Sequence, residues 1–131
     1  MKDDGNPLDV LLCGAGAAGL TLALELARRG VGFCLIDKID TPFGGSRGKG
    51  IQPRTLEIFE DLGIANRLAA AGGPYPPERK YGEDGSDHVA AAEVAPPARP
   101  SEPYTVPLMV PQFLTERVLR QRLAEFGHAP R

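Results

Sequence analysis

A glycine-rich hexapeptide near the N-terminus constrains the fold of this chain more than any other feature. It runs from Gly14 to Gly19 with the spacing Gly-x-Gly-x-x-Gly. A short apolar run at 9–13 precedes it, a segment with helical periodicity at 18–29 follows it, and a second apolar run lies at 31–37. A strand, a helix and a strand in about thirty residues form a right-handed βαβ unit. The sequence therefore predicts an α/β fold with a parallel sheet, in which the continuous apolar run at 9–13 is a strand buried on both faces.

The glycines of the hexapeptide have separate physical tasks in a Rossmann-like unit. Gly14 allows the tight turn out of the strand, Gly16 lets the backbone approach a pyrophosphate, and Gly19 lets the helix pack close to the sheet. The N-terminus of the helix offers free N–H groups and a partial positive charge to phosphates. The candidate phosphate-binding residues are Gly14, Ala15, Gly16, Ala17, Ala18 and Gly19.

An acidic residue closes the second strand. Asp37 lies roughly 20 residues beyond the last glycine, where a carboxylate can accept hydrogen bonds from both ribose hydroxyls of a dinucleotide. Its negative charge disfavours the ribose 2′-phosphate of NADP as a ligand of this loop. These residues alone leave FAD and NAD as open alternatives.

Three further helices are predicted beyond a glycine-rich basic loop at 41–50. Residues 53–62 form the first, with a proline in its first turn and a glycine after its end, and residues 65–71 form a short second one. Apolar spacing predicts the last helix at 115–126, with Thr115 as its N-cap.

Prolines dominate the segment 72–111 and exclude long helices from it. The tetrapeptide 83–86, Glu-Asp-Gly-Ser, is a turn signal that can join strands at 79–81 and 88–89. We expect this segment to be an irregular or β-hairpin excursion from the sheet.

Four stretches of the chain resemble a known family. They are Asp9-Val-Leu-Leu-Cys-Gly-Ala-Gly-Ala-Ala-Gly-Leu, Leu35-Ile-Asp-Lys, Ser46-Arg-Gly-Lys-Gly-Ile-Gln-Pro-Arg-Thr-Leu-Glu-Ile-Phe and Val110-Pro-Gln-Phe-Leu-Thr-Glu-Arg-Val-Leu. Through them the chain resembles the aromatic-ring hydroxylases, the FAD-dependent monooxygenases related to para-hydroxybenzoate hydroxylase and to the polyketide and phenol hydroxylases. The third stretch is the most specific, because simple NAD dehydrogenases have no counterpart of it. The resemblance therefore favours FAD over NAD.

The resemblance implies roles for further residues. The arginine that matches Arg47 reaches the FAD pyrophosphate, where a guanidinium can bind phosphate oxygens bidentately. The glutamine that matches Gln112 bonds the ribityl chain, and Lys38 would lie beside the adenosine. Each of the three also has a simpler interpretation as a solvated or helix-capping side chain. Arg54 matches a family position as well, and it equally fits a surface charge.

The family uses FAD, NAD(P)H and O2 to hydroxylate an electron-rich ring, commonly a phenol. Its members run to several hundred residues and carry later Asp-Gly and Gly-Asp motifs that this sequence lacks. We therefore expect residues 1–131 to be the N-terminal portion of an FAD-binding domain, without a substrate domain or catalytic side chains and inactive without the remaining C-terminal part. A non-catalytic FAD- or nucleotide-binding module and a fragment of an NAD-dependent dehydrogenase are the alternatives.

Composition and charge exclude several other classes. A chain of 131 residues with net charge −2 has room for one core and no electrostatic reason to bind nucleic acid or an anionic membrane. The N-terminus lacks the pattern of a secretory signal, so we expect a cytoplasmic protein. A disulfide and two buried free thiols are then the alternatives for Cys13 and Cys34, and a reducing compartment favours the free thiols. Together with His88 and His128 the cysteines lack metal-ligand spacing.

Overall fold

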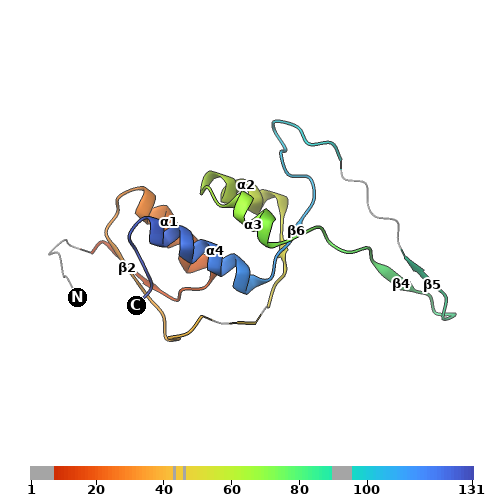
Figure 1. Ribbon diagram of the computed structural model, residues 1–131, viewed down its shortest axis with the longest axis horizontal. Coiled ribbons are helices and arrows are strands. Elements are labelled where there is room, and N and C mark those ends of the chain that lie inside the picture. The colour runs from red at the N-terminus through yellow and green to blue at the C-terminus, as the bar shows by residue number, and fades with distance from the viewer. Residues whose placement is uncertain (1–7, 43, 46, 90–95) are drawn as a thin grey trace.

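The computed structural model of the chain describes residues 8–42, 44–45, 47–89 and 96–131. A parallel strand pair and a group of helices form one end of an elongated molecule, and a hairpin projects from the other (Figure 1). In chain order the elements are β1 (Val10–Cys13), α1 (Ala17–Arg28), β2 (Phe33–Ile36), β3 (Gly50–Ile51), α2 (Pro53–Asp61), α3 (Ala65–Ala71), β4 (Arg79–Tyr81), β5 (Asp87–Val89), β6 (Leu108–Met109) and α4 (Gln112–Glu125). The predicted α/β fold is confirmed.

The βαβ unit lies where the sequence predicts it. Strands β1 and β2 pair in parallel, with Val10 opposite Phe33 and Cys13 opposite Ile36. Both strands are shorter than predicted. The Gly32 carbonyl still accepts bonds from the Asp9 and Val10 N–H groups, at 2.9 and 3.2 Å, but the regular pairing begins only at Phe33.

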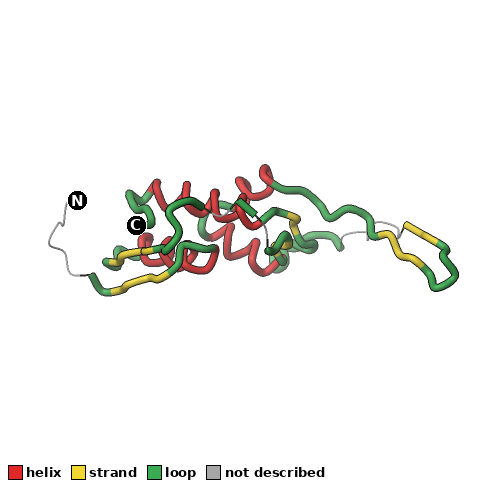
Figure 2. Tube along the Cα trace, turned by 90° about the horizontal axis from the view of Figure 1, so that it is seen from below, coloured by secondary structure: helices red, strands yellow, loops and turns green. Residues whose placement is uncertain are grey.

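Only one face of this strand pair is covered. Leu12 and Leu35 are buried, but Leu11 is 63% exposed and Ile36 is 37% exposed. The sequence predicted a strand at 9–13 buried on both faces, and this prediction is wrong for the described residues. The reason is that the helices lie to one side of the paired strands (Figure 2), and side chains alternate between the faces of a sheet.

The same geometry decides the environment of the cysteines. Both thiols are free, as predicted. Cys13 is exposed rather than buried, because it lies on the uncovered face with Leu11, while Cys34 is half-buried. The interpretation of both as buried apolar residues therefore fails for Cys13.

Helix α4 lies beside α1 and closes the core (Figure 1). Leu20 and Leu24 of α1 and Leu119 and Leu123 of α4 are almost completely buried. The helix begins at Gln112, three residues before the predicted start. Pro111 is its N-cap, so Thr115 is not the N-cap. Thr115 lies inside the helix, and its N–H already donates to the Pro111 carbonyl at 3.2 Å.

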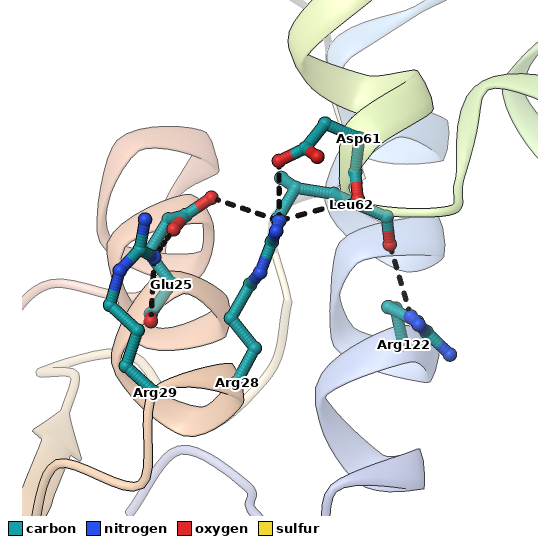
Figure 3. A network of polar contacts seen from close by, with 6 residues as sticks. All are labelled: Glu25, Arg28, Arg29, Asp61, Leu62 and Arg122. Carbon is teal, nitrogen blue, oxygen red and sulfur yellow. Dashed lines mark hydrogen bonds and ion pairs between the residues drawn. The ribbon is translucent and has the colours of Figure 1, made fainter.

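Two arginines from neighbouring helices meet the end of α2 (Figure 3). Arg28 of α1 donates to the Asp61 carboxylate at 2.6 Å and to the Asp61 carbonyl at 3.2 Å. Arg122 of α4 donates to the Leu62 carbonyl at 3.1 Å. The chain then turns at Gly63, whose φ of +73° favours glycine. Cations at a helix C-terminus satisfy its free carbonyls and its partial negative charge, so these contacts join α1, α2 and α4.

The proline-rich segment contains the predicted hairpin. Strands β4 and β5 pair antiparallel and project away from the helices (Figure 1). The Ser86 N–H donates to the Asp84 carboxylate at 3.0 Å, and Gly85 has a φ of +79°. The described residues between 72 and 111 contain no helix. None of the helices that the structure describes is long and apolar enough to cross a membrane.

Candidate functional site

A short antiparallel pair brings the basic loop against the start of α4. Strand β3 pairs with β6, and the Val110 N–H donates to the Lys49 carbonyl at 2.8 Å. The Gln112 N–H donates to the Gly48 carbonyl at 3.0 Å, and the Arg47 N–H donates to the Gln112 side-chain oxygen Oε1 at 3.2 Å. Two residues that are 65 positions apart in the sequence, Arg47 and Gln112, therefore lie in contact.

The glycine hexapeptide forms the turn between β1 and α1. Gly14 has a φ of +107°, which an L side chain rarely adopts. A Cβ at Gly19 would overlap the carbonyl oxygen of Gly14, so the close approach of helix and loop requires glycine there. Helix α1 begins at Ala17 with Gly16 as N-cap and with no side-chain capping bond. Its first turn therefore directs backbone N–H groups and the positive end of the helix dipole outward.

Gly16 is not required by its protein surroundings. Its backbone, at φ −78° and ψ −175°, suits any residue. A Cβ there would meet only the Glu116 oxygen Oε1, at an ordinary contact distance of 3.6 Å. The lack of a side chain at Gly16 therefore leaves space in front of the loop. This is expected for a site where a phosphate approaches the backbone.

The Asp37 carboxylate reaches back to the same turn. It accepts the Ala15 N–H at 2.5 Å and the Ile39 N–H at 3.0 Å. These hydrogen bonds hold the pKa of the Asp37 carboxyl below its ordinary value, and the nearby Arg120 guanidinium acts in the same direction. The group is therefore ionised at neutral pH, and each carboxylate oxygen has a second lone pair with which to accept a hydroxyl.

These segments enclose one surface cavity of about 170 Å³. Its lining residues are Ala15, Gly16, Asp37, Ile39, Thr41, Pro42, Arg47, Gln112, Glu116 and Arg120. Five of the predicted site residues meet here, from four parts of the sequence.

Two other basic residues with family counterparts lie outside the cavity lining. Lys38 is exposed and does not line it. Arg54 pairs with Glu57 on the exposed side of α2, as the surface-charge interpretation predicts. Ser46, the first residue of the most specific stretch, lies outside the described residues.

The sequence did not identify Glu116 and Arg120 as part of the site. Both line the cavity with Gln112, and the three residues are spaced i, i+4 and i+8 along one face of α4. Glu116 is only 6% exposed, and it accepts the Gln112 Nε2 hydrogen bond at 2.8 Å. The Arg120 Nη2 donates to the Ala15 carbonyl at 2.7 Å. This spacing of polar residues from Gln112 was the one available signal.

The histidines lie apart from this cavity. The ring of His128 contacts Phe33, with ring centroids 4.6 Å apart. The side chain of His88 is outside the described part of the structure. Among the residues that the structure describes, no group of three or more histidine, cysteine or acidic side chains is placed to hold a metal ion.

A comparison with known protein families decides which family has this site. The family described as FAD binding domain matches residues 7–131. The chain belongs to this FAD-binding family. A flavin-dependent monooxygenase of Mycobacteroides abscessus is 43% identical over 92% of the chain, which covers 26% of that relative. The 6-methylpretetramide 4-monooxygenase of Streptomyces rimosus is 36% identical over 97% of the chain, which covers 22% of it.

Solved structures agree with this assignment. The flavin-dependent monooxygenase PieE, solved in complex with FAD and substrate, superposes with a TM-score of 0.71 at 27% identity, over 95% of this chain and 24% of that one. The cofactor of this domain is therefore FAD. The cavity fits that group, because it combines a bare glycine turn at a helix N-terminus with two arginines, two carboxylates and one amide. The chain spans about a quarter of the length of the curated relatives it matches.

Proposed function

We propose that the chain is the FAD-binding portion of a flavin-dependent monooxygenase that hydroxylates an aromatic substrate, phenolic or polyketide, with NAD(P)H and O2. The observation that carries this proposal is the convergence of Gly16, Asp37, Arg47 and Gln112 on one cavity. The names of the Mycobacteroides and Streptomyces relatives support a monooxygenase, and the identity to them exceeds one third of the aligned residues.

Each group at the cavity has a task that suits its chemistry. The N–H groups between Gly14 and Gly19 bind the pyrophosphate, and Arg47 neutralises its charge. Ionised Asp37 accepts the ribose hydroxyls of the adenosine half, with Lys38 alongside. Gln112 bonds the ribityl hydroxyls through an uncharged amide, which can both donate and accept.

FAD, when bound, supplies the electron transfer and the oxygen chemistry of such an enzyme. The residues of this chain contribute binding and orientation, and we assign no catalytic side chain among them. Arg47 and Asp37 hold opposite charges in one cavity, so they also fix the direction in which the dinucleotide lies. The free thiols of Cys13 and Cys34 fit a reducing compartment, and we place the protein in the cytoplasm.

The substrate-binding part of the enzyme is proposed to lie outside these 131 residues. The relatives are about four times as long as the matched segment. The aromatic substrate and NAD(P)H would then meet FAD only when the remaining part of the enzyme is present.

A chimera tests the proposed reaction directly. This chain replaces the matching segment of the Mycobacteroides relative, and consumption of NAD(P)H and O2 is measured with and without phenolic and polyketide substrates. Substrate-stimulated consumption and a hydroxylated product support the proposal. A chimera that binds FAD without any turnover supports a non-catalytic FAD-binding module instead.

Two matched variants of the chimera test whether its activity depends on the cavity. Arg47→Ala is expected to reduce FAD content and turnover together, because it removes one of the two arginines that line the cavity. Arg54→Ala removes an arginine of α2 that is 81% exposed and outside the cavity, and it should leave both unchanged. Equal losses in the two variants would contradict the proposed role of Arg47.

A further inference from the structure

Arg120 links the last helix to the phosphate loop across 105 residues of sequence. Its Nη2 donates to the Ala15 carbonyl at 2.7 Å. Its Nε is buried, and no hydrogen-bond partner for it lies among the described residues. A partly buried guanidinium loses hydration, and its hydrogen bond to the Ala15 carbonyl offsets part of that cost while tying α4 to the loop.

The Ala15 backbone is held from two sides. Asp37 accepts its N–H at 2.5 Å, and Arg120 donates to its carbonyl at 2.7 Å. The Ala15 side chain is 1% exposed, so the residue has little room to rotate. The orientation of the Ala15–Gly16 peptide sets the direction of the Gly16 N–H, which leads into the first turn of α1.

Charge supports the same arrangement. Asp37 places a carboxylate beside a cavity meant for a pyrophosphate, and two anions in proximity repel each other. Arg120 lines that cavity, and its positive charge opposes the repulsion. Glu116 also lines the cavity, but it is engaged by the Gln112 amide at 2.8 Å.

We infer that Arg120 is a positioning residue, which holds the Ala15–Gly16 peptide so that the loop N–H groups face the pyrophosphate of FAD. This inference rests on the proposed site and adds a residue that neither the glycine motif nor the family resemblance assigns. It acts through the loop, without requiring contact between Arg120 and the cofactor.

The test compares three variants of the chain by titration with FAD. Arg120→Met keeps the apolar stem and removes the charge and the donors, and it should weaken FAD binding roughly 10- to 100-fold. Arg120→Lys keeps the charge and a donor, and it should restore most of that loss. Arg117→Met is the matched control, because Arg117 lies on the same helix, is exposed and faces the Phe113 ring at 5.9 Å. The Arg117→Met variant should bind FAD with the affinity of the native chain.

A second readout needs no cofactor. The Gly16 amide follows the Ala15 carbonyl, so its ¹⁵N and ¹H shifts respond when a bond to that carbonyl is lost. In FAD-free protein these shifts should change in Arg120→Met and stay constant in Arg117→Met. If both variants leave the Gly16 amide unchanged, the inference is wrong, whether or not the native chain binds FAD. Failure of the native chain to bind FAD, with the Gly16 shift changed, would instead contradict the proposed function.

Folding of the variants is checked by circular dichroism. If Arg120→Met loses its helical signal, Arg120→Leu takes its place, since it also removes the charge and the donors. Native FAD affinity in a folded Arg120→Leu or Arg120→Met variant overturns the inference. A loss of affinity that lysine restores supports it, because a merely structural defect would not depend on charge.

Discussion

Gly16 and Gly19 belong to one motif, but their surroundings differ. A Cβ at Gly19 would overlap the Gly14 carbonyl oxygen, whereas a Cβ at Gly16 would meet one Glu116 oxygen at 3.6 Å. Gly19 is therefore needed by the fold, and Gly16 is free of such a steric demand from the protein. The spacing of the motif alone does not separate these two tasks.

Alanine substitutions should separate them. Gly16→Ala is expected to keep native stability and to weaken FAD binding by about tenfold or more, since its methyl group occupies the side from which the phosphates approach. Gly19→Ala is expected to destabilise the fold by about 1–3 kcal/mol through overpacking. Urea unfolding and FAD titration of both variants provide the measurement. Destabilisation by Gly16→Ala comparable to that by Gly19→Ala would contradict this division.

The lowered pKa of Asp37 predicts that the stability of the fold depends on pH. Its pKa in the folded protein is lowered, chiefly by the Ala15 N–H, so its hydrogen bonds stabilise the fold fully above the ordinary pKa near 3.8. That contribution is lost as the pH falls from this value through the depressed pKa of the folded state. In Asp37→Asn the free energy of unfolding should therefore fall less steeply as the pH is lowered. Urea midpoints between pH 6 and 2 test this, and parallel curves for the variant and the native chain would refute it.

At the scale of elements, the β1–β2 pair is a sheet with one covered face. The run at 9–13 is apolar throughout and shows no alternation with polar residues, so the sequence predicted that this strand is buried on both faces. The distribution of helices decides the matter: α1 packs against β1 and β2, where Leu12 and Leu35 are buried, while Leu11 and Ile36 stay exposed. The helices lie to one side of the strand pair (Figure 2).

Truncation of neighbouring leucines should give opposite results. Leu12 is 8% exposed, and Leu12→Ala is expected to cost about 2–5 kcal/mol because a cavity remains in the core. Leu11 is 63% exposed, and Leu11→Ala should change the free energy of unfolding by no more than about 0.5 kcal/mol. Chemical denaturation of both variants measures the difference. A large loss on truncation of Leu11 would show that its face is covered in solution.

Local sequence signals predicted most helices and strands. The features that were not predicted depend on contacts between residues far apart in the sequence. Glycines, prolines and apolar spacing located the βαβ unit, α2, α3 and the hairpin from their own residues. The start of α4 was misplaced because Gly48, far away in the sequence, bonds the Gln112 N–H. Arg47 and Gln112 were predicted from family resemblance. Glu116 and Arg120 were missed, since their i+4 and i+8 spacing from Gln112 was the one signal that they share its face of α4.

At the scale of the whole molecule, one end holds the cavity and the other is the projecting β4–β5 hairpin (Figure 1). The chain corresponds to about a quarter of its curated relatives. We expect it to bind FAD and to show no NADPH- and phenol-dependent oxygen uptake by itself. An oxygen electrode tests this expectation with FAD in excess. Steady substrate-dependent uptake by the purified chain would place the whole reaction within these 131 residues.

The most direct test is a titration of the purified chain with FAD, followed by visible absorption and flavin fluorescence. Saturable binding that Arg47→Ala weakens and Arg54→Ala leaves intact is the predicted result, because only Arg47 lines the cavity. A parallel titration with NAD should show weaker binding. Saturable binding of NAD without any binding of FAD would contradict an FAD site built from the glycine turn, Asp37, Arg47 and Gln112.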